Sequence, residues 1–261
     1  MIELVDVRKK FGKTEVLKGI NATFKPGMVN LIIGKSGSGK TVLIKSIVGL
    51  IKPTSGEILY NGVDFVKMNI EEKKAIRREL GMLFQGNALF DSKTVLENVR
   101  FPLDMFTRES LSEKNEKVNA VLNRVKLINS NNKLPSEISG GMQKRVGIAR
   151  AIVMNPKYLF CDEPNSGLDP QTSIVIDELI KELTEEYNMT TIVNTHDMNT
   201  VIGSGDKILF LHQGSKHWEG NNESLFESDN QELIDFIFAS DFLKEARDAR
   251  LAAWKKKQIK I

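Results

Sequence analysis

Residues 34–41 read GKSGSGKT, which fits the pattern G-x-x-x-x-G-K-[ST] of a phosphate-binding loop. An apolar strand is predicted directly before this loop, over residues 28–33, and a helix directly after it, over residues 42–48. Glycine lets the backbone turn its N–H groups inward, and the start of the helix adds partial positive charge, so the loop predicts an anion site. Its members are Gly34, Lys35, Ser36, Gly37, Ser38, Gly39, Lys40 and Thr41.

The last two residues of the loop carry the predicted chemistry. In loops of this pattern the lysine reaches the β- and γ-phosphates and the hydroxyl binds Mg²⁺, so we assign these roles to Lys40 and Thr41. The alternative is a glycine-rich loop that fits by chance, and the flanking strand and helix argue against it. The loop predicts nucleotide binding without saying which nucleotide.

Composition limits the class of protein. A chain of 261 residues with 41% hydrophobic and 27% charged residues is typical of a soluble globular protein, as one large domain or one with an insertion. The single cysteine, Cys161, excludes an internal disulfide and fits a reducing compartment. No apolar run approaches the roughly 18 residues of a membrane span, and charges throughout residues 1–10 argue against a secretory signal.

The charge of +3 is unevenly distributed. Residues 241–261 hold seven Lys or Arg against three Asp or Glu, which leaves −1 for the first 240 residues. A near-neutral body lacks the clustered basic face of a nucleic-acid channel, so we expect no nucleic-acid partner.

A second candidate anion site lies at residues 138–143, ISGGMQ, before a helix predicted over residues 144–154. A hydroxyl and two glycines, Ser139, Gly140 and Gly141, stand where that helix would begin. One nucleotide cannot reach two distant anion sites on the same chain. The motif is therefore either a plain helix cap or a grip on a phosphate held by another subunit.

Carboxylates follow a buried strand predicted over residues 157–161. At the carboxyl end of such a strand Asp162 could hold Mg²⁺ through water, and Glu163 could orient and polarise an attacking water. The alternative is a surface acidic turn. Cys161 lies within the apolar strand, so we interpret it as a packing residue.

Two further residues leave alternatives open. His196 follows a strand predicted over residues 190–194 and is either a contact to a γ-phosphate or a structural histidine. Phe11 follows the first predicted strand and is either a core residue or a stacking partner for a purine.

The motifs together resemble the nucleotide-binding subunit of ATP-binding cassette (ABC) transporters. They are Phe11, GKSGSGKT at 34–41, Gln85, ISGGMQ at 138–143, YLFCDEP at 158–164, SGLD at 166–169 and His196. The resemblance covers roughly residues 1–220. It implies an α/β phosphate-loop NTPase of the ABC-ATPase fold with an N-terminal antiparallel β-subdomain and an inserted helical subdomain. We expect an ATP-binding core in residues 1–85 and 156–220, a helical signature subdomain in 86–155, and a basic, helical C-terminal extension in 221–261.

The resemblance also implies roles for particular residues. Phe11 would stack on adenine, Gln85 would bind Mg²⁺ and sense the γ-phosphate, Glu163 would be the catalytic base, and His196 the switch histidine. Residues 139–141 would grip ATP on the opposite subunit, and Asp169 would contact the other half of a homodimer that sandwiches two ATP molecules. Three departures from the family pattern are mild, namely Ile138 for leucine, Met142 for glutamine and Phe11 for tyrosine.

A narrower resemblance is carried by residues 81–92, GMLFQGNALFDS, together with SGGM and THDM. These stretches are similar to the ATPase of Mce-associated (Mla-type) phospholipid transport systems. That likeness implies integral-membrane permease subunits, an Mce-type substrate-binding protein and a peripheral place on the cytoplasmic side of the inner membrane. The alternatives are another ABC system, such as an amino-acid or other small-solute importer, or a non-transport ABC ATPase that gates a membrane-bound regulator, as in cell division.

The C-terminal tail, residues 232–261, reads as one helical, amphipathic stretch. It includes Trp254 and the basic run Lys255, Lys256 and Lys257. The tail either packs on its own domain, docks on the second ATPase subunit, or touches anionic lipid.

Overall fold

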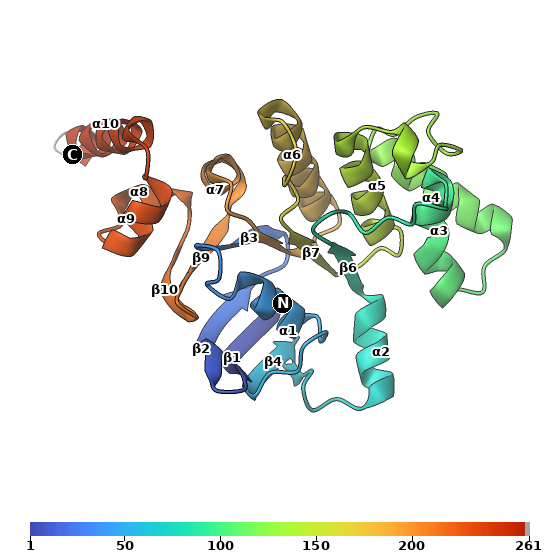
Figure 1. Cartoon of the computed structure of the whole chain (residues 1–261), viewed down its shortest axis with the longest axis horizontal. Coiled ribbons are helices and arrows are strands. Elements are labelled where there is room, and N and C mark those ends of the chain that lie inside the picture. The colour runs from blue at the N-terminus through green and yellow to red at the C-terminus, as the bar shows by residue number, and fades with distance from the viewer. Residues whose placement is uncertain (259–261) are drawn as a thin grey trace.

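A six-stranded sheet forms the centre of the computed structural model, which describes residues 1–258 (Figure 1). Its strand order is β10-β9-β3-β8-β7-β6, and all neighbours are parallel except β10, which pairs antiparallel with β9. The strands are β3 (Met28–Ile33), β6 (Leu80–Leu83), β7 (Tyr158–Asp162), β8 (Thr190–Asn194), β9 (Lys207–His212) and β10 (Ser215–Gly220). Because the carboxyl ends of parallel strands meet at one edge, the loops after β3, β7 and β8 can share a site.

A second, antiparallel sheet is built from the N-terminal part of the chain. Its order is β2 (Thr14–Phe24), β1 (Ile2–Phe11), β4 (Ser55–Tyr60) and β5 (Val63–Asp64). Asn61 and Gly62 join β4 to β5 with positive φ angles of 49° and 84°, the left-handed pair that the Asn-Gly signal predicts for a tight hairpin. β1 runs as far as Phe11, and register shifts together with a left-handed Asp6 interrupt its pairing with β2 and β4.

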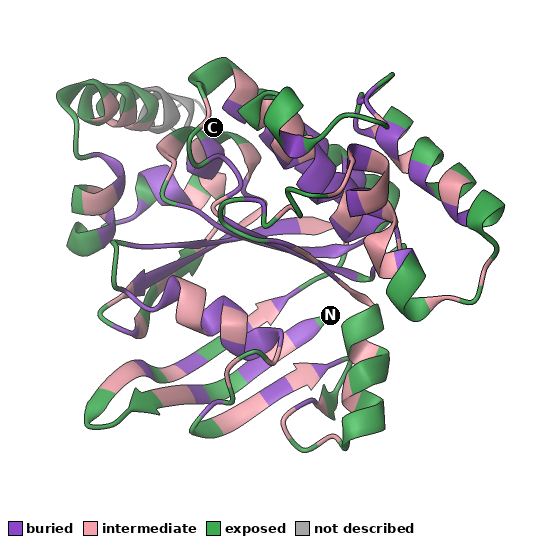
Figure 2. Ribbon diagram, turned by 45° about the vertical axis from the view of Figure 1, so that its right-hand side comes forward, coloured by how far each residue is buried: buried purple, intermediate pink, exposed green. Residues whose placement is uncertain are grey.

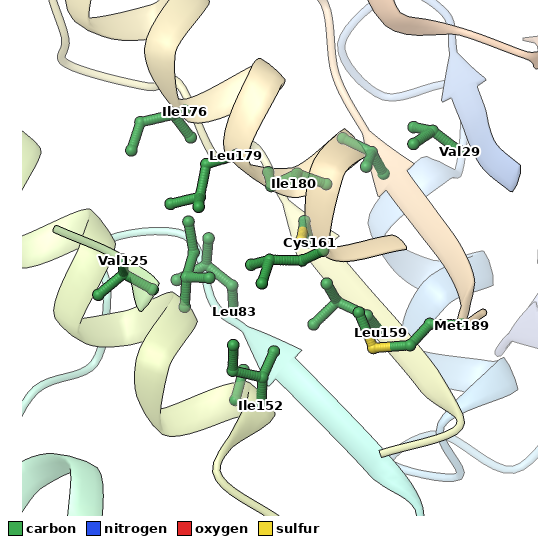
Figure 3. Packing of buried hydrophobic residues seen from close by; sticks show 14 of the residues in the cluster. Val29, Leu83, Val125, Ile152, Leu159, Cys161, Ile176, Leu179, Ile180 and Met189 are labelled. Carbon is green, nitrogen blue, oxygen red and sulfur yellow. The ribbon is translucent and has the colours of Figure 1, made fainter. Parts of the chain in front are cut away.

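Helix α1 (Lys40–Ile47) lies between the two sheets. Its Leu43, Ile44 and Ile47 are fully buried in a cluster with both sheets. On β7, Tyr158 and Phe160 face this cluster, whereas Leu159 and Cys161 face a second cluster on the opposite side of the central sheet (Figure 3). The strand is therefore buried on both faces, which explains its continuous apolar sequence and confirms Cys161 as a packing residue.

Further helices cover the face of the central sheet opposite to α1 (Figure 2). Within residues 86–155, all of which the structure describes, there are helices and no strand: α3 (Val95–Phe106), α4 (Leu111–Arg124), the short 3₁₀ helix η1 (Pro135–Glu137) and α5 (Gly140–Ile152). Capping boxes begin two of them, with Thr94 and Glu97 at α3 and Ser110 and Glu113 at α4. α5 packs on β6 and on α6 (Pro170–Glu186), so this helical segment shares the core of the sheet. The remaining helix before it, α2 (Ile70–Arg78), lies beside β6.

The C-terminal tail is helical, and its helical part is divided into two helices. It forms α9 (Gln231–Ile237) and α10 (Asp241–Gln258), and Ser240 accepts a hydrogen bond from the Leu243 amide where α10 begins. The short helix α8 (Asn222–Glu227) lies within the expected helical extension, whereas the short helix α7 (Met198–Ser204) was not predicted. Trp254 and the basic run 255–257 lie outside the residues whose side chains are described. In the part of the chain that the structure describes, no helix is both long and apolar enough to cross a bilayer.

Candidate functional site

The loop 34–41 connects β3 to α1 at the carboxyl edge of the central sheet. Gly37 and Gly39 have φ angles of 80° and 103°, in the region that favours glycine, and Gly39 is the N-cap of α1. Gly34 approaches its neighbours closely, since a Cβ there would lie 2.2 Å from the carbonyl oxygen of Leu211. The loop therefore needs its glycines for both conformation and space.

Lys40 is held inside this loop. Its ammonium Nζ donates to the carbonyl oxygens of Gly34 at 2.7 Å and Lys35 at 3.3 Å, and the residue is only 7% exposed. Burial lowers the pKa of Lys40, while the charges of Glu163 and Asp162 raise it. The charge is thus directed into the loop rather than into solvent.

Asn194 joins two residues that the sequence assigned to Mg²⁺. Its amide Nδ2 donates to Asp162 Oδ1 at 2.5 Å and lies 3.4 Å from Thr41 Oγ1. The carboxylate and the hydroxyl therefore lie on either side of one amide group, close to each other. Sequence reasoning did not assign Asn194 to the site, although a polar residue at the end of an apolar strand was an available signal.

A second cluster gathers around the Glu163 carboxylate. Gln85 Nε2 donates to Glu163 Oε2 at 2.8 Å, and His196 Nδ1 lies 3.2 Å from Glu163 Oε1. The Glu163 backbone is left-handed, with φ 51°, and its amide donates to the carbonyl oxygen of Asn194. Three residues predicted from separate motifs thus converge at one carboxylate.

One cavity of about 940 Å³ joins the loop 34–41 to Gln85, Glu163 and His196. Such a volume suits a nucleotide-sized ligand. Four lining residues were not predicted: Val16, Val42, Met198 and Phe236. Phe236 belongs to α9 and stacks on Phe210 of β9 with ring centroids 5.5 Å apart, so the C-terminal extension forms part of the wall.

Other predicted residues do not line this cavity. Phe11 is exposed at the end of β1, with Lys9 Nζ 4.8 Å from its ring centre. Ser139 is the exposed N-cap of α5 and accepts a hydrogen bond from the Met142 amide at 3.3 Å.

Gly140 and Gly141 begin α5, and they too lie outside the cavity lining. A Cβ on Gly141 would lie 2.6 Å from the Thr172 methyl group, so this position has no room for a side chain. Asp169 caps α6, and hydrogen bonds from the Thr172 hydroxyl and amide lower its pKa. The motif at residues 139–141 and Asp169 are therefore neighbours, and neither lines the cavity of the chain.

The oxygen atoms of this site suit Mg²⁺ as ligands when a bound phosphate supplies further oxygen ligands. Among the described residues no three His, Cys, Asp or Glu side chains form a metal site by themselves. Mg²⁺ is commonly held by one or two carboxylates, substrate phosphates and waters. The Asp162 carboxylate and the Thr41 hydroxyl are oxygen ligands of this kind, and the Gln85 carbonyl is a third.

The loop, its lysine and the facing carboxylates define a phosphate-loop nucleotide-binding protein. A protein-family model described as "ABC transporter" matches residues 17–166, more than half of the chain. The chain therefore belongs to the ABC transporter family. It has the fold of that family's ATPase cassettes, whose cofactors are ATP and Mg²⁺.

Curated relatives agree with this assignment. The probable ribonucleotide transport ATP-binding protein mkl of Mycobacterium bovis is 36% identical over 236 residues, which cover 90% of this chain and 66% of the relative. The methionine import ATP-binding protein MetN of Campylobacter jejuni is 36% identical over 261 residues, covering 94% and 78%. The chain thus spans slightly less than two-thirds of the length of the mycobacterial relative.

Solved structures confirm the fold. A dimeric structure of MJ0796, described as a bacterial ABC transporter cassette, has a TM-score of 0.77 and 36% identity and covers 85% of this chain and 99% of that chain. A further structure of that cassette is a dimeric post-hydrolysis state bound to ADP and Pi. CbiO1 from Clostridium perfringens, part of the transporter complex cbiONQ, has a TM-score of 0.80 and 30% identity over 90% and 94% of the two chains.

Proposed function

We propose that two copies of this chain bind MgATP between them, head to tail, and hydrolyse it to drive a membrane permease. The observation that carries this proposal is that Ser139, at the start of α5, is exposed and does not line the cavity of its own chain. In a head-to-tail dimer this position completes the cavity of the partner. The dimeric cassettes among the similar structures support the same arrangement.

The residues divide the work within each composite site. The amides of residues 34–41 and the ammonium of Lys40 bind the phosphates, and Phe11 stacks on the adenine. Thr41, Asp162 and Gln85 would hold Mg²⁺, which supplies charge neutralisation at the phosphates. Asp169 contacts the partner beside its serine-glycine motif.

Glu163 acts as the general base. Its carboxylate orients the attacking water and accepts a proton from it, while Gln85 and His196 hold the two carboxylate oxygens by hydrogen bonds. His196 also contacts the γ-phosphate as the site closes. Phosphoryl transfer needs positioning and charge stabilisation more than covalent chemistry, and this arrangement supplies both.

A lateral groove of about 310 Å³ is the proposed permease contact. It lies between β6 and the helices α3 and α5, and its lining includes Phe84, Phe90, Phe101 and Phe106, with Arg77 at the rim. Several lining residues belong to the stretch 81–92, whose sequence resembles lipid transport ATPases. A rotation of the helical segment on ATP binding would be transmitted through this groove to the permease.

The cargo that we propose is phospholipid, with an Mce-type substrate-binding protein and a location on the cytoplasmic side of the inner membrane. The support is the resemblance of residues 81–92. The names of the relatives, ribonucleotide transport and methionine import, favour a small-solute system instead. Gating of a cell-division regulator is a third possibility, because the ATPase motifs are common to all three.

Mixed dimers test the shared sites. Ser139→Asp keeps a good helix cap but directs a negative charge at the partner's triphosphate, and Lys40→Ala removes a phosphate contact. Each variant alone should lose most of its hydrolysis. A one-to-one mixture should regain about a quarter of the wild-type rate, because half of the dimers then hold one intact composite site. Phosphate release on mixing is the measurement.

The control for this experiment is each variant mixed with itself at the same total concentration. A mixture no faster than these controls would contradict a site built from two chains. Full hydrolysis by Ser139→Asp alone would remove residue 139 from the site.

Affinity purification from membranes tests the cargo. We expect an Mce-type protein and a multi-span permease to co-purify with the chain, because the lateral groove presents an aromatic surface to a partner. Phe84→Ala combined with Phe106→Ala, which removes rings only from the groove, should reduce this recovery. A solute-binding protein or a cell-wall enzyme in place of the Mce-type protein would overturn the lipid assignment.

A further inference from the structure

A buried polar cluster lies beneath the Glu163 and His196 loops. It consists of Asn165 in the turn after β7, Asp177 on α6 and Thr200 on α7. These residues are 8%, 7% and 1% exposed, respectively. Three segments that are separate in the sequence therefore meet at one point away from solvent.

The cluster is a closed ring of hydrogen bonds. Asn165 Nδ2 donates to Asp177 Oδ1 and to Thr200 Oγ1, both at 2.9 Å. The Thr200 hydroxyl donates to Asp177 Oδ2 at 2.7 Å. Both oxygens of the carboxylate are thus used, one for each neighbouring segment.

Keeping a carboxylate here is energetically unfavourable. Burial raises the pKa of Asp177 to about 6, with the nearby Asp197 adding to the rise, although the hydrogen bonds from Thr200 and Asn165 lower it. An apolar residue at a helix–helix contact would avoid this cost. A contribution to stability alone therefore does not explain why a carboxylate is present in this cluster.

The chain connects this cluster directly to the proposed hydrolytic residues. Asn165 follows Glu163 by two residues, and Thr200, in the first turn of α7, follows His196 by four residues. Glu163, Asn165 and His196 also line one small cavity of about 280 Å³. A shift at Thr200 or Asn165 would move the Glu163–His196 pair.

We propose that Asp177 is a positioning residue for ATP hydrolysis, whose carboxylate ties the Glu163 turn to α7 and so keeps Glu163 and His196 within hydrogen-bond distance. The proposal rests on the function proposed above for these two residues. Asp177 does not line the cavity of the loop 34–41 and acts through Asn165 and Thr200.

Thr200→Val in the full chain is the test, since valine keeps the shape and removes only the hydroxyl. We expect kcat to fall about tenfold or more while KM for ATP changes by less than about twofold, because geometry at the reacting group is lost and binding is not. Thr200→Ser restores the hydroxyl and should keep kcat within about threefold of wild type. Asp177→Asn leaves one acceptor oxygen where two are used, so either Asn165 or Thr200 loses its acceptor, and this variant should reproduce the loss of kcat.

Thr184→Val is the matched control. Thr184 is also fully buried and bonded twice, to the carbonyl oxygen of Ile180 and to Thr191 Oγ1, both at 2.7 Å, but it lies toward the other end of α6. It should lower the melting temperature about as much as Thr200→Val while leaving kcat within about twofold of wild type.

Three results would overturn the positioning role: an unchanged kcat in Thr200→Val, an equal loss in Thr184→Val, or no recovery in Thr200→Ser. Glu163→Gln, measured in parallel, distinguishes a failure of the positioning role from a failure of the proposed function. If Glu163→Gln keeps full turnover, the proposed function itself fails. If Glu163→Gln abolishes turnover and Thr200→Val does not, only the positioning role fails.

Discussion

Glu163→Gln should lower ATP hydrolysis at least about 100-fold, because a general base contributes roughly 10²–10⁴ to the rate and an amide cannot accept the proton. The glutamine has nearly the shape of the glutamate and can still contact Gln85 and His196, so ATP binding should be retained. With binding intact and hydrolysis blocked, the ATP-bound dimer should accumulate. Phosphate release, equilibrium ATP binding and size-exclusion chromatography with ATP measure the three effects.

Glu185→Gln is a suitable control for this result. Glu185 is an exposed residue near the end of α6, away from the cavity, and carries the same change of charge. It should hydrolyse ATP at the wild-type rate and show no stable dimer. Normal turnover in Glu163→Gln would exclude Glu163 as the base.

Lys40→Ala should weaken ATP binding by a factor of about 10 to 150. A hydrogen bond to a charged group contributes about 1.5–3 kcal/mol, and about 1.4 kcal/mol corresponds to tenfold in affinity. The ammonium now bonds to the carbonyl oxygens of Gly34 and Lys35, so it is already directed into the loop that would hold the phosphates. Titration with a non-hydrolysable ATP analogue is the measurement.

Lys45→Ala serves as the matched control, because Lys45 is on the same helix and does not line the cavity. Its affinity for the analogue should equal that of the wild type. An unchanged affinity in Lys40→Ala would show that the phosphates bind elsewhere.

Local sequence was sufficient where local chemistry decides the structure. The loop 34–41 has its glycines and its lysine at fixed spacing, and residues 158–161 form an apolar run because both faces of β7 are buried. The Asn61-Gly62 turn needs two left-handed residues, and few residue pairs accept that conformation.

Tertiary contacts decided what the sequence did not show. α7 has only seven residues and little periodicity, and it is held by its Asp197 cap and by the bonds of Thr200. Phe236 reaches the nucleotide cavity only because α9 folds back on β9. The cluster of Asn165, Asp177 and Thr200 joins residues 12 and 23 positions apart, at no spacing that pattern analysis recognises.

The convergence of the site residues was predictable only in part. Their positions after β3, β7 and β8 follow from the rule that parallel strands end at one edge. The contact of Gln85 with Glu163 also requires β6 to lie beside β7, which depends on strand order. The sequence analysis treated residues 139–141 as distant from the loop 34–41, and in the structure they lie outside the cavity lining.

The left-handed backbone of Glu163 has an evolutionary consequence. A non-glycine residue in that conformation carries strain of about 1–3 kcal/mol, which a glycine would relieve while removing the carboxylate. Selection for heat resistance alone would therefore favour losing this side chain, whereas selection for turnover would keep it. Laboratory evolution for thermal tolerance alone should therefore replace Glu163. The resulting proteins should be more stable and inactive in ATP hydrolysis.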